Sequence, residues 1–238
     1  MWLIAEYSAS ALFSLKPATA TASGGKTLLV PTPFAIKMAL LDIAIRLEGR
    51  ERAAAAWDAW IGTARVALHP PERIVVNNTF MKVLRPRRNP AQPGTQHAGY
   101  FQQTIAYREY AQWHDALGLA FEFGEELDAH QLSLWLLNVN YLGKRGSFIQ
   151  LQRPPQPAET LPDGYIVVDG DLGAFPLNAL LTQLDDVGEG TTFAQVDIYS
   201  GKHIQLGKQR VLRHVALPYR LVASSRGYSY YEWQEGDI

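Results

Sequence analysis

Residues 128–151, DAHQLSLWLLNVNYLGKRGSFIQL, combine three structural signals in one short stretch. Asp128 is a good N-cap, and Leu132, Trp135 and Leu136 recur on one side of a helix predicted over 129–138. A glycine-flanked turn follows at 141–148, and a strand is predicted from there to 151. The stretch therefore predicts a helix that packs inward through its apolar side and passes directly into a strand.

The residues before this stretch predict a similar succession of elements. Thr32 can cap a helix that begins at Pro33 and runs to about Leu47. A second helix is predicted over 52–61, and extended segments are predicted over 1–8, 65–68, 73–76, 80–84, 105–110 and 117–123. The order strand–helix–strand–strand–helix–strand favours an α+β fold with a ferredoxin-like, or RRM-type, core.

Two further regions complete the predicted organisation. Residues 85–99 contain three prolines and no apolar period, so they predict a loop or flexible projection within the core. Residues 153–238 predict a β-rich C-terminal extension. Its strands are expected at 165–168, 209–222 and 228–233, its loops at 154–164 and 169–190, and one short helix near 177–184.

Composition excludes several classes of protein. The 238 residues are 47% hydrophobic, which is enough for a sizeable core. There is no cysteine, so disulfides, thiolate zinc sites and cysteine nucleophiles are excluded. The N-terminus lacks a basic region before its apolar residues, which disfavours a signal peptide, and no apolar run reaches membrane-spanning length. A cytoplasmic, non-membrane protein is expected.

The charges are segregated along the chain, although the formal net charge is only −1. No Asp or Glu occurs in 73–108, 130–158 or 198–231, whereas 109–128 contains six acids and no Lys or Arg. This pattern suggests one basic face and one acidic face. The alternative is that folding mixes the two signs.

The segment Ser23-Gly24-Gly25-Lys26-Thr27 resembles the end of a phosphate-binding loop. That motif needs a further glycine five residues before Gly25, where this chain has Ala20. A nucleotide triphosphatase is therefore disfavoured. Gly24, Gly25 and Lys26 either meet one RNA phosphate or form a plain loop.

No catalytic or metal-binding pattern is present. The six histidines form no His-x-x-x-His pair, and no Gly-x-Ser-x-Gly elbow supports a serine nucleophile. We therefore assign no catalytic residue, no metal ligand and no cofactor.

Two basic segments are candidates for RNA binding. In 82–88, Lys82, Arg85, Arg87 and Arg88 lie close together without an acid, which suits phosphate binding. Aromatic residues follow that could stack on unpaired bases: Tyr100, Phe101, Tyr107 and Tyr110. The alternative is a solvated basic loop with core aromatics behind it.

The second basic segment is the turn Tyr141–Phe148. Gly143 and Gly146 permit backbone torsions that other residues resist, Lys144 and Arg145 supply charge between them, and Ser147 can donate to a phosphate oxygen. Such a turn can hold a bent RNA backbone. As a bare motif it is unspecific, since many helix-to-strand turns contain Gly and Lys.

These pieces together resemble the CRISPR-associated protein 5 family, one of the repeat-associated (RAMP) proteins of class 1, Cascade-type effector complexes. The resemblance rests on Gly24–Thr27, on the helix entry Pro31–Phe34 and on the helix followed by Tyr141–Arg145, and covers about residues 1–152. It implies a ferredoxin-like domain with a protruding thumb inserted around 85–104. It also implies that Gly143, Lys144, Arg145 and Ser147 contact the handle nucleotides or lie directly beneath them.

The resemblance further implies an antiviral ribonucleoprotein role. The subunit would hold the 5′ handle of the CRISPR RNA and cap the backbone filament. It would contact a backbone subunit resembling CRISPR-associated protein 7 and a large effector subunit, and would meet target DNA only through the complex.

Two alternatives to a non-catalytic RNA-binding subunit stay open. Some members of the family cut precursor RNA without metal, by helping the 2′-hydroxyl to attack. A matching Tyr, Lys and His set is not found here, since Arg145 rather than His follows Lys144. The other alternative is an unrelated α+β enzyme whose basic loops are incidental.

Overall fold

The computed structural model describes residues 1–20, 25–95, 98–124, 128–169 and 178–234. Its elements in chain order are β1 (Trp2–Ala9), α1 (Pro33–Glu48), α2 (Arg50–Ala56), a π-helical turn (Trp57–Ile61), β2 (Val66–His69), β3 (Arg73–Ala91), β4 (Gly99–Trp113), β5 (Leu117–Glu122), α3 (Ala129–Asn138), β6 (Ile149–Leu151), β7 (Gln156–Ala158), β8 (Ile166–Val167), β9 (Leu180–Val187), α4 (Phe193–Val196), β10 (Arg210–Leu217), β11 (Tyr219–Ser224) and β12 (Tyr228–Trp233).

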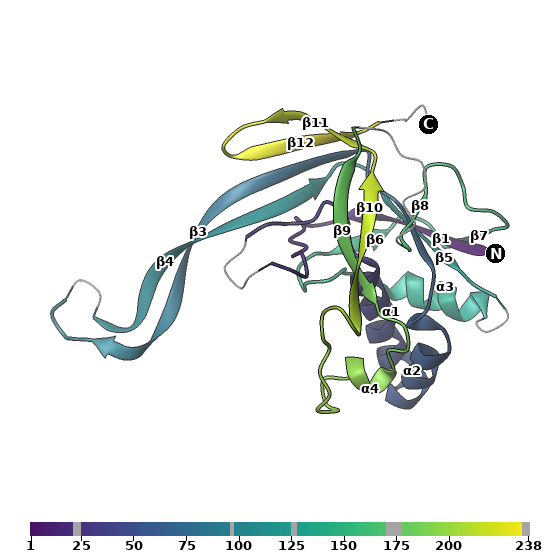
Figure 1. Cartoon of the computed structure of the whole chain (residues 1–238), viewed down its shortest axis with the longest axis horizontal. Helices are drawn as coiled ribbons and strands as arrows, with labels where there is room; N and C mark the ends of the chain where they lie inside the picture. The colour runs from purple at the N-terminus through teal and green to yellow at the C-terminus, as the bar shows by residue number, and fades with distance from the viewer. Residues whose placement is uncertain (21–24, 96–97, 125–127, 170–177, 235–238) are drawn as a thin grey trace.

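The first sheet has the strand order β6-β1-β5-β2-β8, and every pair in it is antiparallel. β6 and β7 share one edge of β1, where β6 pairs with Tyr7–Ala9 and β7 with Trp2–Ile4. In Figure 1, α1 and α3 both lie below this sheet. The sheet is therefore covered by helices on one face, as its alternating buried side chains require.

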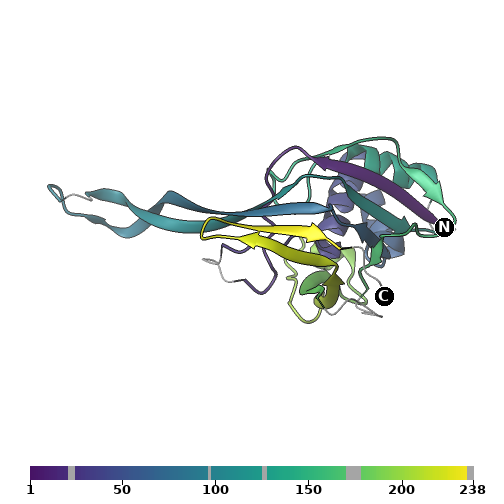
Figure 2. The ribbon, with the colours of Figure 1, turned by 90° about the horizontal axis from the view of Figure 1, so that it is seen from above.

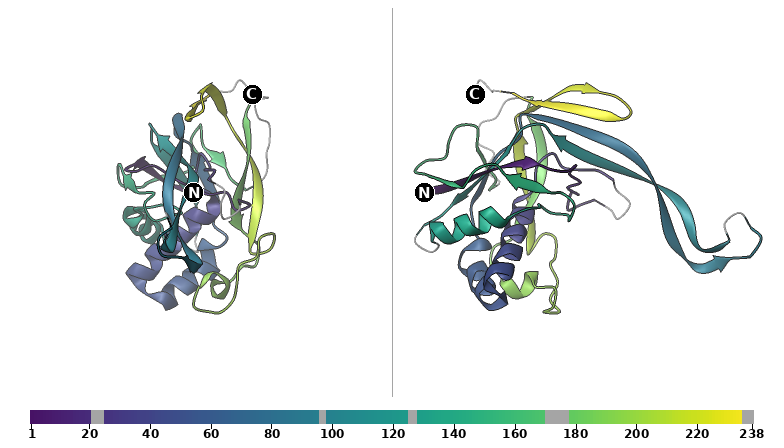
Figure 3. Two further views of the ribbon diagram at one scale, coloured as in Figure 1. Left: turned by 90° about the vertical axis from the view of Figure 1, so that its left-hand side faces the viewer. Right: turned by 180° about the vertical axis from the view of Figure 1, so that it is seen from behind.

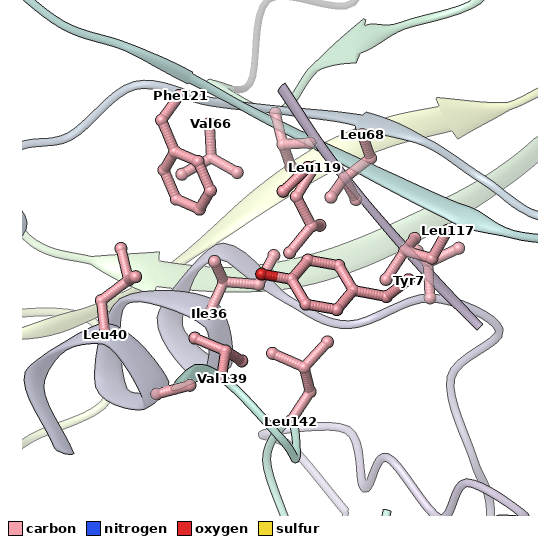
Figure 4. Packing of buried hydrophobic residues seen from close by; sticks show 14 of the residues in the cluster. Tyr7, Ile36, Leu40, Val66, Leu68, Leu117, Leu119, Phe121, Val139 and Leu142 are labelled. Carbon is pink, nitrogen blue, oxygen red and sulfur yellow. The ribbon is translucent and has the colours of Figure 1, made fainter. Parts of the chain in front are cut away.

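The helices pack on the sheet through large apolar side chains. Thr32 caps α1 as expected, because its hydroxyl accepts a hydrogen bond from the Ala35 amide at 3.2 Å. Tyr7 of β1 is fully buried, and its hydroxyl donates to the carbonyl of Leu136 in α3 at 2.7 Å. Figure 4 shows this ring among the leucines of β5 and the side chains of α1. The bond satisfies a polar atom inside the core and fixes α3 against β1.

The second sheet has the order β11-β12-β3-β4, and β9 pairs with β10 in a separate ribbon. β12 pairs with β3 only over 73–77, whereas β3 and β4 continue together far beyond that point. We call this continuation the arm, residues 78–91 and 99–109. Figures 1 and 3 show it projecting from the body as a long twisted two-stranded ribbon.

The residues after 152 contribute strands to both sheets. β7 and β8 extend the first sheet, while β11 and β12 build the second. Seen from above in Figure 2, the β11–β12 hairpin lies alongside the base of the arm. The domain boundary at 152 stays a prediction.

The α+β class and several of the elements predicted for the first 152 residues are confirmed. The fold is α+β with antiparallel sheets, and the predicted strand at 1–8 and the helices at 33–47 and 129–138 are present. The second helix begins two residues earlier than predicted and turns π-helical at Trp57. The prediction of a loop over 85–99 is wrong for 85–91, which continue β3. These residues are mostly arginine and proline and have no apolar period, so the usual strand signal is missing.

Three predictions in the C-terminal part are wrong. The helix expected near 177–184 is strand β9 from Leu180 on, held by pairing with β10, and residue 177 lies outside the described residues. The strand expected over 209–222 is two strands separated at Pro218, which has no N–H to donate. The predicted loop at 154–164 contains β7.

None of the helices in the described part of the chain is both long and apolar enough to cross a membrane.

Candidate nucleic-acid interface

The turn at 141–148 is a tight, hydrogen-bonded loop. Gly143 and Gly146 have φ angles of 70° and 102°, where a side chain is unfavourable. The Ser147 amide donates to the Lys144 carbonyl at 3.0 Å, and the Leu142 amide donates to the Ser147 carbonyl at 3.2 Å. The fold thereby presents Lys144 and Arg145 at its tip, both exposed.

The turn is anchored to the body from beneath. Leu142 is fully buried and Ser147 is only 2% exposed, so Ser147 lies under the tip rather than on it. The Tyr141 hydroxyl donates to Asp42 of α1 at 3.1 Å. Burial, and then the negative charge of Asp42, raise the pKa of Tyr141. This base fixes the backbone of the turn, and the Tyr141 hydroxyl also interacts with the Arg145 side chain, so of the two cations only Lys144 stands without a partner among the described residues.

A segment that we call the strap, residues 13–15 and 25–28, joins this turn to the base of the arm. Phe13 forms a bridge with Ala111 of β4, with N–O distances of 2.8 and 2.7 Å. Leu15 accepts from the Leu28 amide at 2.7 Å, and its Cδ2 lies 3.3 Å from the position of a Cβ on Gly143. The turn and the arm therefore meet the same short segment.

The glycine and lysine of the phosphate-loop-like segment have structural roles in the strap. A Cβ on Gly25 would lie 2.0 Å from the Tyr107 carbonyl oxygen, so only glycine allows this approach to β4. Lys26 pairs with Glu109 at 2.6 Å, and this hydrogen bond raises its pKa. Lys26 is still 78% exposed, but its charge is partly balanced. Gly24 lies outside the described residues.

The arm has two distinct faces because side chains alternate along a strand and paired residues share a face. One face, which we call the Phe80 face, carries large apolar side chains around one lysine. Its members are Phe80, Lys82, Leu84, Pro86, Phe101, Gln103, Ile105 and Tyr107. Glu109, two residues from Tyr107, points to this side as well, so the strap lies at the base of the Phe80 face.

The Phe80 face is open to solvent. Phe80, Leu84 and Ile105 are 56%, 65% and 60% exposed, and Phe101 and Tyr107 are similarly open. Phe80 and Tyr107 form a ring pair with centroids 4.4 Å apart. Exposed apolar patches of this kind mark binding surfaces. The alternative in which these aromatics are core residues is therefore wrong for Phe101 and Tyr107, and also for Tyr100, which is 64% exposed.

The basic residues of 82–88 also lie on the arm. Lys82, Arg85 and Arg88 are exposed, while Arg87 is half-buried and its Nε has no hydrogen-bond partner among the described atoms. Lys82 belongs to the Phe80 face, and Arg85, paired with Gln102, lies on the opposite face. Cations thus occur on both faces of an arm that contains no acid before Glu109.

Sequence reasoning missed one buried ion pair. Lys37 of α1 is 2% exposed and donates to Asp186 of β9 at 2.8 Å and to the Gly62 carbonyl at 3.3 Å. Burial lowers the pKa of Lys37, against the opposing effect of Asp186. The pair lines a cavity of about 340 Å³ together with Arg213. A lysine on the apolar side of α1 was the only signal for it.

Within the described ranges, His, Asp and Glu side chains form no group of three or more that could hold a metal ion.

Sequence comparison with known proteins finds a relative. No protein-family model matches the chain. The CRISPR-associated protein Cas5 of Archaeoglobus fulgidus is 26% identical over 180 residues, covering 73% of this chain and 74% of the relative.

Two solved structures were also compared. A chain of a CRISPR RNA-guided surveillance complex shares 14% identity and covers 91% of this chain and 90% of its own length, with a TM-score of 0.49. A CRISPR protein from Archaeoglobus fulgidus shares 12% identity and covers 99% of this chain and 92% of its own length, with a TM-score of 0.39. The sequence match alone therefore carries the assignment: the resemblance drawn from the sequence motifs is confirmed, and the chain is a relative of CRISPR-associated protein Cas5.

Proposed function

We propose that this chain is a non-catalytic RNA-binding subunit of a Cascade-type CRISPR effector complex, which holds the 5′ handle of the CRISPR RNA and caps the backbone filament. One observation carries the proposal. Two exposed cations, Lys144 and Arg145, stand on a glycine-built turn that the strap joins to the base of an arm with no acid before Glu109.

The core of this subunit is proposed to be ferredoxin-like, with the arm as its thumb. Support comes from the strand order β6-β1-β5-β2, which is antiparallel throughout, with α1 and α3 on one side. Numbered by their place in the core, these strands have the order 4-1-3-2, which suits two strand–helix–strand units folded into one sheet. The arm lies between the second and third of these strands, and residues 153–238 form the proposed extension.

The chemistry of the surface suits a single-stranded RNA. Lys144 and Arg145 would neutralise backbone phosphates, and Lys82, Arg85 and Arg88 would continue this contact along the arm. The exposed rings of Phe80, Phe101 and Tyr107 offer flat faces on which unpaired bases stack.

The proposed partners follow from this role. The subunit would contact a backbone subunit resembling CRISPR-associated protein 7 and a large effector subunit, and would act in the cytoplasm. The relative named CRISPR-associated protein Cas5 supports membership of such a complex.

A binding measurement on the turn tests the proposal. We expect Lys144→Ala with Arg145→Ala to weaken binding of a labelled repeat RNA, followed by fluorescence anisotropy. The slope of log affinity against log salt should fall by about 0.7 for each phosphate that the variant no longer neutralises. The matched control is Lys202→Ala with Lys208→Ala, two exposed lysines beyond α4. Unchanged handle binding in the turn variant would show that the turn is not the RNA site.

The non-catalytic part of the proposal needs a separate assay. Incubation of the purified chain with labelled repeat RNA in EDTA should leave the RNA intact. Site-specific cutting that persists after repurification would instead identify a metal-independent endoribonuclease on the same scaffold.

A further inference from the structure

The outward face of the second sheet carries a group of tyrosines that the proposed function does not use. Asn77 of β3 pairs with Tyr110 of β4 on one side and with Tyr228 of β12 on the other, so the three form one row across the sheet. In the next row, Val75 pairs with Tyr230. Paired residues share a face, so all three tyrosines point the same way. We call this surface the tyrosine face.

The opposite face of these strands is the packed one. Ile74, Val76, Ala111 and Trp113 are buried in the core, and they alternate in sequence with the residues of the tyrosine face. The tyrosine face is therefore the solvent side of the sheet. Tyr228 is 42% exposed, and Tyr110 and Tyr230 are half-buried.

The carboxylates on this face are already bound. Asp115 pairs with Arg73 at 2.9 Å, and Glu232 accepts from Arg220 and from the Tyr230 hydroxyl. The hydrogen bond from Arg73 lowers the pKa of Asp115, and the one from Tyr230 lowers the pKa of Glu232. Both carboxylates are therefore ionised and already bonded within the protein.

The cations toward the arm are not bound in this way. Arg108 shares a row with Thr79, and Arg85 lies farther out on the same side of the ribbon. Within the described residues, no carboxylate lies within ion-pair distance of Arg85 or Arg108. The surface thus combines aromatic rings with free positive charge on their arm side.

We propose that the tyrosine face is a second binding site for single-stranded nucleic acid, separate from the turn and on the side of the sheet opposite to the Phe80 face. Tyr110 and Tyr228 stack unpaired bases, and the Asn77 amide between them bonds a base edge. Arg108 binds a backbone phosphate of the same strand as it continues toward the arm.

The test uses the full chain with labelled oligo(U) and oligo(dT) of equal length, which separate RNA from DNA as the source of the strand. Tyr110→Leu with Tyr228→Leu removes both rings but keeps apolar bulk. We expect affinity for at least one strand to fall roughly five- to hundredfold. Tyr110→Phe with Tyr228→Phe keeps the rings and should bind as the unmodified chain does. Tyr199→Leu, at an 87% exposed tyrosine beyond α4, is the matched control.

The outcomes separate this site from the proposed function. If the leucine variant binds both strands as tightly as the unmodified chain, or if the phenylalanine variant loses as much affinity as the leucine variant, the proposal is overturned. Tyr228→Leu alone, at the more exposed position, repeats the test if the double variant does not fold. The two sites are distinct if the Lys144→Ala, Arg145→Ala variant loses handle binding but still binds oligo(U). They are also distinct if the Tyr110→Leu, Tyr228→Leu variant loses oligo(U) binding but still binds the handle.

Discussion

Gly25 and Gly143 show how one residue type serves two purposes in this site. At Gly25 the constraint is space, because a Cβ would collide with the Tyr107 carbonyl oxygen. At Gly143 the constraint is conformation, because φ is 70°. Both hold the strap and the turn in register with β4, so the placement of the exposed cations depends on these glycines.

Lys37 is a residue on which stability depends. Removing it by Lys37→Met takes away the nearer of two cations on the buried carboxylate of Asp186. Arg213 remains 3.9 Å away, and the Val187 amide still donates to the carboxylate. Breaking a buried ion pair from one side costs about 3–5 kcal/mol. We expect urea denaturation to show a decrease of this size in the free energy of unfolding.

The matched control for Lys37 is an exposed pair. Arg153 and Glu6 lie 2.7 Å apart with side chains 62% and 30% exposed. Arg153→Met should change the unfolding free energy by no more than about 1 kcal/mol. Equal decreases in the two variants would show that the Lys37–Asp186 pair is not the stabilising contact.

Asp115 makes the acid stability of the second sheet depend on Arg73. The hydrogen bond from Arg73 lowers the pKa of Asp115 below its ordinary value of 3.8. The folded state therefore binds the proton less tightly than the unfolded state. This stabilising contribution is present above pH 3.8 and disappears as the pH falls through the lowered pKa.

An NMR titration of the Asp115 carboxyl carbon measures this effect. We expect its pKa to lie below 3.8 in the unmodified chain and to rise in Arg73→Gln. A pKa at or above 3.8 in the unmodified chain would contradict the assignment of this pair.

Among the elements, the arm is the one that the fold supports least. An isolated two-stranded ribbon is only marginally stable in water. β12 supports its base as far as residue 77, the Asn78 amide donates to the Gly227 carbonyl at 2.8 Å, and the strap contacts Glu109. Beyond Phe80 each strand pairs only with the other, so this outer part contributes surface rather than stability.

Shortening the arm tests this separation. Met81 and Ala106 pair directly, so residues 82–105 can be replaced by Asn-Gly as a two-residue hairpin turn. We expect the melting temperature to change by only a few degrees, while affinity for repeat RNA falls. A full-length arm with Lys82, Arg85, Arg87 and Arg88 changed to Ala separates charge from shape, and its salt slope should fall by as much as about 2.8. Unchanged RNA affinity in both variants would remove the arm from the interface.

On the scale of the whole molecule, the strap places the turn and the Phe80 face on one side of the protein. An RNA that follows this side would contact Lys144 and Arg145 first and Lys82 later. The tyrosine face lies on the other side of the same sheet.

A double-mutant cycle checks whether one RNA covers both contacts. Lys144→Ala with Arg145→Ala forms one side of the cycle, and Lys82→Ala forms the other. Since the two sites share no side-chain contact, their effects on binding free energy should add to within about 0.5 kcal/mol when both grip one handle RNA. If Lys82→Ala weakens binding only while the turn is intact, the two sites are not independent. The RNA then does not follow the path from Lys144 and Arg145 to Lys82.

The sequence determined much of the local structure. Thr32 and Asp128 identified two helix starts, because an N-cap bonds only to its own first turn. The same holds for the glycines and cations of the turn, which lie within a few residues of one another. The motifs around them were enough to indicate the Cas5 resemblance that the sequence match confirms.

The tertiary structure decided what distant residues do together. Pairing of β12 with β3, contact of Gly25 with Tyr107 and burial of Lys37 on Asp186 join segments that are far apart in the chain, and no local period records them. Residues 85–91 of the arm are the clearest case, since their arginines and prolines lack the alternation that reveals a half-buried strand. Local chemistry therefore determined the helices and the basic turn, while long-range packing determined that the turn, strap and arm form one surface.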